Sequence, residues 1–191
     1  MIRAFIAIEL PAAIQEGIDR ETAQIRLTLK TTLVRWVAKQ NVHLTLKFLG
    51  DVSASTLEQI AAQLAQQMKS FSPFEMSVGG LGVFPNHNKP RVIWIGLKAP
   101  EDLTIIAEII ETTASSYGFI RETRPFSPHL TIGRVRQPIS EIENRLIRSS
   151  LEFVKANQLG RMSVHELIIF RSDLKPSGAV YTKLHAIPLQ S

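Results

Sequence analysis

The sequence has no cysteine among its 191 residues, and this absence excludes several kinds of protein. Without a thiol, the chain cannot build a disulfide framework, a thiolate zinc site, an iron–sulfur cluster or a cysteine nucleophile. Long apolar runs are missing as well, and none approaches the roughly 18–20 residues that a membrane span requires. We therefore expect a cytoplasmic protein with no membrane partner.

The chain also has only a small excess of charge, a net +5. This basic excess favours anionic partners weakly, since many enzymes without a nucleic-acid role share it. The N-terminus begins with a basic Arg3, and Glu9 ends its apolar stretch after residues 4–8. Such a stretch is too short for the core of a signal peptide, so residues 2–9 are expected to form a strand.

Strand-like and helix-like segments alternate along the whole chain. Helical spacing of apolar residues predicts helices after Pro11, from Ser55, over 101–117 and from Ser140. Ser55 and Ser140 each precede a Glu by three residues, which is the pattern of a capping box. Segments rich in Val, Ile, Leu and Phe and bounded by turn residues predict strands. These segments are 2–9, 34–39, 42–49, 74–80, 91–97, 128–135, 164–171 and 180–188, with 151–155 as a weaker candidate.

Short connections between strands determine the predicted fold class. The link between 34–39 and 42–49 is too short for a parallel crossover, so we expect mostly antiparallel sheets in an α+β fold. The glycines of 79–82 lack the Gly-Lys-Ser/Thr ending of a phosphate-binding loop and are predicted to form a turn. The polar turn 85–90 is the one plausible mid-chain break. Residues 1–191 are therefore predicted to form a single domain.

One short motif occurs twice, as His-Leu-Thr-Leu from His43 and as His-Leu-Thr-Ile from His129. The two copies lie 86 residues apart, and each falls inside a predicted strand. A capped helix follows each copy, which indicates two related halves facing each other across a pseudo-two-fold axis. Residues i and i+2 of a strand point to the same face, so each histidine shares a face with Thr45 or Thr131.

This arrangement predicts phosphoester chemistry. Two imidazoles can divide general acid and general base catalysis near neutral pH. Hydroxyl donors can hold the non-bridging oxygens of a phosphate, where charge develops in the transition state. Alternation places Lys47 on the same face. Arg134 would reach that face only through a bulge at Gly133, and its guanidinium would then clamp a phosphate.

A metal site is the main alternative for the two histidines. A two-histidine metal site needs a third protein ligand, and neither motif contains a carboxylate, so we expect no metal and no other cofactor. Lys47 could equally be a solvated charge at the rim. The remaining histidines, His87, His165 and His185, do not repeat the motif and are expected to be solvated or structural.

The pair of His-x-Thr motifs resembles the signature of the two-histidine (2H) phosphoesterase superfamily. Within it, the chain is similar to the bacterial and archaeal RNA 2′,3′-cyclic phosphodiesterases, also called 2′-5′ RNA ligases. The likeness extends over nearly the whole chain. It includes RAFIAIELP at 3–11, HLTLKFLG at 43–50, RVIWIG at 91–96, RPFSPHLTIGR at 124–134, ELIIFRS at 166–172 and Tyr181.

The resemblance implies a bilobal α+β fold, with outer helices around a central cleft, and a metal-free reaction on RNA ends or nucleotide cyclic phosphates. It implies that His43 is the general acid for the departing 3′-oxygen and that His129 is the general base for water. Thr45, Thr131 and Arg134 would bind the phosphate, and the product would keep the phosphate on the 2′-oxygen. The reverse chemistry would be 2′-5′ ligation. No obligatory protein partner is expected.

Two other functions remain open at this point. The chain could act on a small cyclic nucleotide or on an ADP-ribose cyclic phosphate. It could also be a non-catalytic module that binds RNA ends, although such a module would need basic groups and hydroxyls more than a matched pair of imidazoles.

Overall fold

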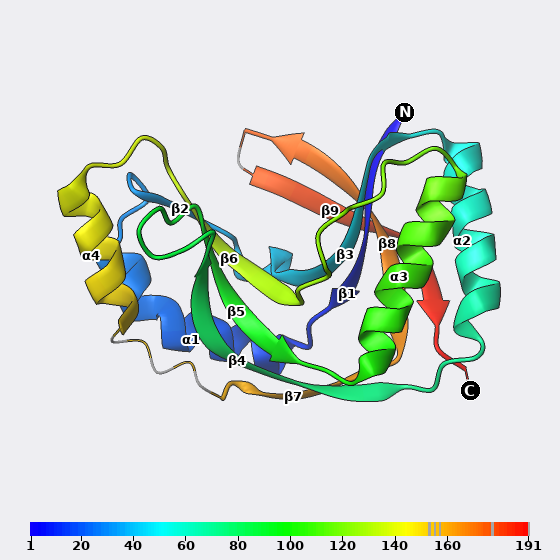
Figure 1. Cartoon of the computed structure of the whole chain (residues 1–191), viewed down its shortest axis with the longest axis horizontal. Helices are drawn as coiled ribbons and strands as arrows, with labels where there is room; N and C mark the ends of the chain where they lie inside the picture. The colour runs from blue at the N-terminus through cyan, green and yellow to red at the C-terminus, as the bar shows by residue number, and fades with distance from the viewer. Residues whose placement is uncertain (153, 155, 157, 177, 191) are drawn as a thin grey trace.

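The computed structural model describes residues 1–152, 154, 156, 158–176 and 178–190 (Figure 1). Helices and strands are mixed along the whole chain, as the sequence predicts. In order, they are β1 Ile2–Glu9, α1 Ala12–Thr28, β2 Val34–Trp36, the 3-10 turn η1 Lys39–Asn41, β3 His43–Val52, α2 Ala54–Met68, β4 Phe74–Phe84, β5 Val92–Lys98, α3 Glu101–Ser116, β6 His129–Val135, α4 Glu141–Glu152, β7 Gly160–Val164, β8 Glu166–Lys175 and β9 Gly178–Pro188.

The strands form one curved sheet in the order β7-β4-β5-β6-β3-β1-β8-β9, with β2 also paired to β6. Every strand pair in it is antiparallel. A single register pair, Leu44 with Leu130, joins β3 to β6 in the middle of the order. It divides the sheet into a first lobe of β3, β1, β8 and β9 and a second lobe of β6, β5, β4 and β7. The predicted bilobal, antiparallel α+β fold is confirmed.

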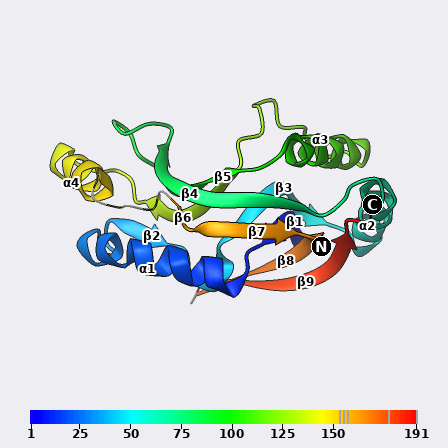
Figure 2. The same cartoon turned by 90° about the horizontal axis from the view of Figure 1, so that it is seen from below.

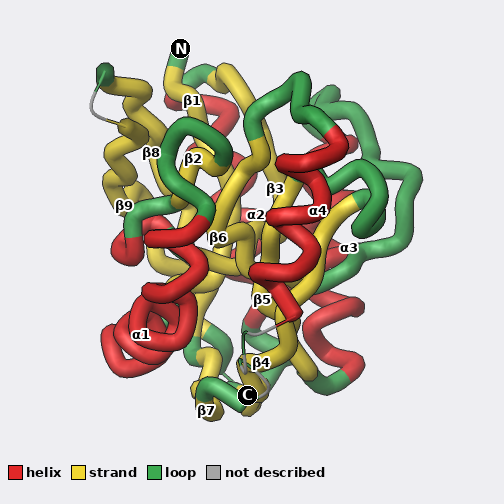
Figure 3. The backbone as a smooth tube through the Cα atoms, turned by 90° about the vertical axis from the view of Figure 1, so that its left-hand side faces the viewer, coloured by secondary structure: helices red, strands yellow, loops and turns green. Residues whose placement is uncertain are grey.

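The two lobes are related by a pseudo-two-fold axis at the β3–β6 junction. Leu44 and Leu130 are the second residues of the two motifs, so the pairing itself is symmetric. Helices α2 and α3 pack on the first lobe, and α1 and α4 pack on the second (Figures 1 and 2). Each lobe thus takes one helix from each half of the chain. Figure 3 looks onto α1 and α4, with the strands behind them.

The first lobe buries apolar side chains on both faces of its sheet. Ala4, Ile6 and Ile8 of β1 belong to the main core. Phe5 and Ala7 alternate with them and form a second small cluster with Ile168, Phe170 and Tyr181 on the other face. This second face carries His43, because Phe5 and Tyr181 both contact its ring. An aromatic floor therefore lies under one of the two motif histidines.

Some predicted boundaries are wrong, each for a local reason. The glycines of 79–82 lie inside β4 instead of forming a turn, and a register irregularity between Val78 and Leu81 accommodates them. Gly82 is needed there because a Cβ would lie 2.2 Å from the ring of Trp94. Strand β7 was missed, and β2 ends earlier than expected. The weak strand candidate at 151–155 begins inside α4, and two of its residues lie outside the described ones.

The helix starts follow the sequence with one correction. At α4 the predicted capping box is present, since the Glu143 carboxylate accepts from the Ser140 amide at 2.7 Å and the Glu143 amide donates to the Ser140 hydroxyl. At α2 the cap is Ser53 instead of Ser55, and its hydroxyl accepts from the Thr56 amide. None of the helices in the described part of the chain combines the length and apolarity that crossing a membrane demands.

The Leu44–Leu130 pair gives a stability prediction. Leu44 is 1% exposed, so Leu44→Ala removes buried methyl groups and leaves a cavity at the junction. We expect a loss of about 3 kcal/mol in the free energy of unfolding, measured by urea denaturation. Leu27→Ala, on the exposed side of α1, is the matched control and should cost less than about 0.5 kcal/mol. Equal losses in the two variants would contradict the central role of the junction.

Candidate active site

The register of the β3–β6 junction brings the four motif side chains together. Leu44 faces Leu130. Antiparallel counting then sets His43 opposite Thr131 and Thr45 opposite His129. All four are partly exposed, whereas Leu44 and Leu130 are buried on the other face. Opposed residues in such a pair have Cβ atoms about 5 Å apart, so the structure places the predicted groups in one rectangle on one face.

The two histidine rings are held in the same way. The Nδ1 of His43 lies 2.8 Å from the carbonyl oxygen of Asn41, and that of His129 lies 2.8 Å from the carbonyl oxygen of Ser127. A carbonyl can only accept, so Nδ1 carries the proton in both rings. Each Nε2 is therefore left to accept or deliver a proton, which is the state that acid–base catalysis requires.

The surroundings of the two rings differ. His43 stacks on Phe5 at a centroid distance of 4.7 Å and meets the edge of Tyr181 at 5.3 Å. Burial lowers the pKa of His43, and the hydrogen bond to Asn41 opposes this effect. His129 contacts the edge of Phe84 at 5.0 Å. The pseudo-symmetry of the motifs thus does not extend to the environments of their imidazoles.

Both motif strands contain a bulge at the same place. In β3 the register passes from Ala7–Thr45 to Ile6–Lys47, which leaves Leu46 without a partner on β1. In β6 it passes from Trp94–Thr131 to Ile93–Gly133, which leaves Ile132 without a partner on β5. The bulged residue is the fourth residue of the motif in each case. A bulge exchanges the faces of all residues that follow it.

The bulge makes the predicted placement of Lys47 wrong. Lys47 is paired with Ile6, a residue of the main core, so it points away from the histidines. Its ammonium donates to the carboxylate of Glu111 at 2.6 Å and to the carbonyl of Ile120 at 2.8 Å. Lys47 is only 7% exposed. These bonds make Lys47 part of a buried ion pair between β3 and α3 instead of a phosphate ligand.

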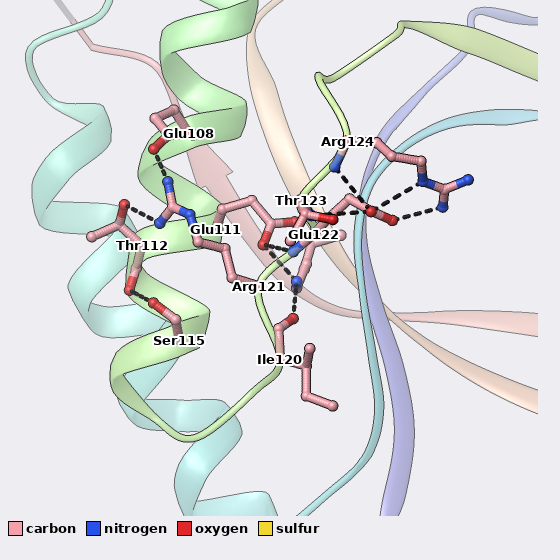
Figure 4. A network of polar contacts seen from close by, with 10 residues as sticks. Glu108, Glu111, Thr112, Ser115, Ile120, Arg121, Glu122, Thr123 and Arg124 are labelled. Atoms are coloured by element: carbon pink, nitrogen blue, oxygen red, sulfur yellow. Dashed lines mark hydrogen bonds and ion pairs between the residues drawn. The ribbon is translucent and has the colours of Figure 1, made fainter.

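The same ion pair fixes the segment that leads into β6 (Figure 4). Glu111 also accepts a hydrogen bond from the Glu122 amide, and Lys47 holds the Ile120 carbonyl. Glu122 in turn pairs with Arg124, and hydrogen bonds from Arg124 lower the pKa of Glu122 to about 2. The network therefore ties the chain before His129 to the first lobe, although His129 itself belongs to the second.

The second bulge has the opposite effect on Arg134, because it turns this side chain toward the face of the histidines. After the irregularity, Arg134 pairs with Val92, two residues from the Trp94 that faces Thr131. Arg134 and Thr131 therefore share a face, as the sequence predicts if Gly133 permits a bulge. A Cβ at Gly133 would lie 2.9 Å from both Trp36 and Val34, so only glycine fits there. The guanidinium of Arg134 is exposed on the histidine face.

Some neighbours of the site carry no motif signal. The resemblance includes both Tyr181 and Phe5, but no local pattern predicts that either ring contacts His43. Their contact with His43 depends on β1, β8 and β9 lying side by side, which no local pattern encodes. A pocket opens beside His43 between η1 and β9. Its lining includes Glu9, Gln40, Asn41, Phe170, Tyr181 and Lys183.

Among the described residues, no three His, Asp or Glu side chains converge in a way that could hold a metal ion. The nearest ion pair beside His43 joins Glu9 to Lys183 at 2.5 Å, and its carboxylate is already engaged. The donor set around the motifs thus includes two imidazoles, two hydroxyls and the guanidinium of Arg134.

Comparison with known proteins gives the family. The profile described as LigT like Phosphoesterase matches residues 8–94 and again residues 95–181, so each match contains one histidine motif. The chain belongs to the LigT-like phosphoesterase family. This phosphoesterase is 35% identical to the RNA 2′,3′-cyclic phosphodiesterase of Methanothermobacter thermautotrophicus, over 98% of the chain and 99% of the relative. It is 32% identical to that of Archaeoglobus fulgidus, over 96% and 98%.

Solved structures confirm the LigT-like fold. E. coli LigT complexed with 3′-AMP matches with a TM-score of 0.77 and 27% identity, over 100% of this chain and 99% of that one. E. coli LigT complexed with phosphate matches with a TM-score of 0.72 and 27% identity, over 100% and 98%. The predicted 2H phosphoesterase membership is therefore confirmed.

The Lys47–Glu111 pair predicts a non-additive effect on stability. Lys47→Met leaves the largely buried Glu111 carboxylate without its cation and should lower the free energy of unfolding by about 3 kcal/mol. The double variant Lys47→Met with Glu111→Leu removes both charges and should be more stable than Lys47→Met alone. Urea denaturation of both single variants and the double variant measures the coupling. Additive losses would show that the two charges act independently.

The lowered pKa of His43 predicts a pH dependence of stability. Because burial favours neutral His43, the unfolded chain binds a proton near pH 6.5 that the folded chain does not yet bind. The stabilising contribution is present above about pH 6.5 and is lost as the pH falls through the lower folded-state pKa. We expect wild type to lose more stability than His43→Gln between pH 7 and pH 5 in urea titrations. Parallel losses would contradict the burial effect.

Proposed function

We propose that this phosphoesterase hydrolyses 2′,3′-cyclic phosphate ends of RNA to 2′-phosphate ends. The observation that carries the proposal is the rectangle of His43, Thr131, Thr45 and His129 on one face of the β3–β6 junction. The names of the relatives, which describe RNA 2′,3′-cyclic phosphodiesterases, support the choice of substrate. Residues 1–191 would act as one unit, because each lobe supplies one imidazole and one hydroxyl.

In the proposed reaction, His129 accepts a proton from water through Nε2 while the water oxygen attacks phosphorus. The bond between phosphorus and the 3′-oxygen breaks, and His43 donates a proton from its Nε2 to that oxygen. Thr45 and Thr131 donate hydrogen bonds to the non-bridging oxygens, where charge develops. Arg134 adds charge-assisted hydrogen bonds from the neighbouring position. Water and the 3′-oxygen lie on opposite sides of phosphorus, as in-line displacement requires.

The environment of His43 is compatible with its role as the acid. Burial lowers its pKa in the free protein, so its imidazole is a readier proton donor once charged. A bound phosphate anion within about 4–6 Å favours the charged form again. Substrate binding would therefore favour protonated His43, which then donates its proton to the departing 3′-oxygen. If the 5′-hydroxyl of a second RNA takes the place of water, the same displacement of the 3′-oxygen forms a 2′-5′ phosphodiester, and we include this 2′-5′ ligation as a second reaction of the same site.

The proposal predicts that both histidines are essential. His43→Ala and His129→Ala should each lower kcat on an oligonucleotide 2′,3′-cyclic phosphate by at least about 100-fold, the usual contribution of a general acid or base. His87→Ala, in the exposed turn between β4 and β5, is the matched control and should keep wild-type kcat. Circular dichroism establishes that all three variants are folded. Retained turnover in either motif variant would overturn the assignment.

The product and the metal dependence test the remaining steps. End-group analysis should find the phosphate on the 2′-oxygen, and a 3′-phosphate would show that the other bond breaks. Chelation with EDTA should leave kcat unchanged, whereas loss of kcat on chelation and its recovery with zinc would support a metal site.

Parallel assays with a mononucleotide and with an ADP-ribose cyclic phosphate separate RNA hydrolysis from the small-molecule alternative. Salt-sensitive binding without turnover would indicate a binding module.

A further inference from the structure

A third pair of side chains extends the rectangle of histidines and threonines. Strand β2 pairs with β6 on the same edge as β3 does, because β5 occupies the other edge. In the β2–β6 register, Arg35 is directly opposite Arg134. Directly opposed residues of an antiparallel pair share a face. Arg35 therefore lies beside Arg134 on the face that carries the two histidines.

The three pairs form a regular series along β6. His129 faces Thr45, Thr131 faces His43, and Arg134 faces Arg35. Ile132 is the bulged residue and does not count in the alternation of side chains. Neighbouring pairs are therefore separated by roughly 6.6 Å along β6, the spacing of residues i and i+2 in a strand. The arginine pair thus lies next to the His43–Thr131 pair and farthest from His129.

The two guanidiniums are exposed and uncompensated. Among the described residues, no ion pair includes Arg35 or Arg134. Like charges directly opposed across an antiparallel pair destabilise each other, so an anion between them relieves a repulsion that the fold itself creates. Burial raises the pKa of Tyr181, at the edge of the His43 ring, and the charges of Arg134 and Arg3 oppose this effect. The pair therefore borders the His43 side of the site.

Among the described residues, the opposite end of the rectangle has no directly opposed pair of arginines. The pseudo-two-fold axis maps Arg134 onto Phe48, since each follows its motif histidine by five residues and each comes two residues after the bulge. Phe48 shares a face with Phe5, which stacks on His43, and is 65% exposed. The position of Arg134 is thus cationic, and its pseudo-two-fold equivalent is aromatic. This difference gives a bound RNA end a direction.

We propose that Arg35 and Arg134 bind the phosphodiester on the 5′ side of the terminal nucleotide of an RNA substrate. The proposal rests on the function proposed above, in which the attack runs from the His129 side toward the His43 side. Beyond the departing 3′-oxygen come C3′, C4′, C5′ and then the 5′ phosphodiester of the same nucleotide. The arginine pair lies in that direction, beyond His43. Arg35 lies on β2 and not on the motif strand β6, so it would serve this upstream phosphate alone, whereas Arg134 would also contact the reacting phosphate.

The test compares two substrates that differ by one phosphodiester. Adenosine 2′,3′-cyclic phosphate lacks the upstream phosphate, and the dinucleotide ApA with a 2′,3′-cyclic end has it. Arg35→Gln should lower kcat/KM about tenfold on the dinucleotide, mainly through KM, and leave the mononucleotide unchanged. The slope of log(kcat/KM) against log(salt) on the dinucleotide should become shallower by about 0.7. Arg35→Lys should restore the slope but only part of the affinity, since an ammonium lacks the bidentate fork.

Arg148→Gln, an exposed position on α4, is the matched control for charge and should keep wild-type kinetics on both substrates. An equal loss on both substrates in Arg35→Gln would place Arg35 at the reacting phosphate and overturn the inference. Wild-type kinetics on both would overturn it as well. The melting temperature of Arg35→Gln should match or exceed that of wild type, because a like-charge contact is removed. If wild type itself turns over neither substrate, the proposed function fails, which is a different result.

Discussion

The antiparallel pairing of β3 with β6 at Leu44 and Leu130 is the contact on which the rest of the site depends. The two lobes meet at β3 and β6. Among the described residues, Leu44 and Leu130 form the one register pair between these two strands. Because the paired leucines occupy the same place in both motifs, the pairing sets each histidine across from the threonine of the other motif. A shift of one residue would send these side chains to the buried face. The buried leucines thus fix the register, and the register fixes the chemistry.

The bulge after each motif then makes the two halves unlike. Bulges at the same motif position reverse the faces of the residues that follow. In the first motif this buries Lys47 against Glu111 and exposes Phe48. In the second, glycine takes the buried position and Arg134 the exposed one. The same backbone feature, with different residues after it, therefore yields a buried ion pair on one side and an exposed cation beside the histidines on the other.

Unlike surroundings also separate the two imidazoles, whose backbone hydrogen bonds are the same. His43 lies on an aromatic floor from β1, β8 and β9, whereas His129 begins a strand whose approach is tied to α3 by Glu111 and Lys47. Burial against these aromatic rings disfavours the charged form of His43 and so lowers its pKa. Two closely similar motifs thus hold imidazoles in different surroundings, because it is the environment of His43 and not its motif that lowers the pKa of His43.

The sequence alone determined the motif strands, the four α-helices and the antiparallel α+β class, since alternation, capping residues and short links are local features. It also predicted that the two His-x-Thr pairs act together, because the motif occurs twice in matching contexts. The tertiary structure decided the rest. Where Lys47 points depends on a bulge that forms only against β1, and the neighbours of His43 depend on strands from both ends of the chain. That Arg35 stands beside Arg134 depends on β2 reaching the free edge of β6. Such pairings bring together residues far apart in sequence, and their register is set by packing across the whole sheet and not by any local pattern.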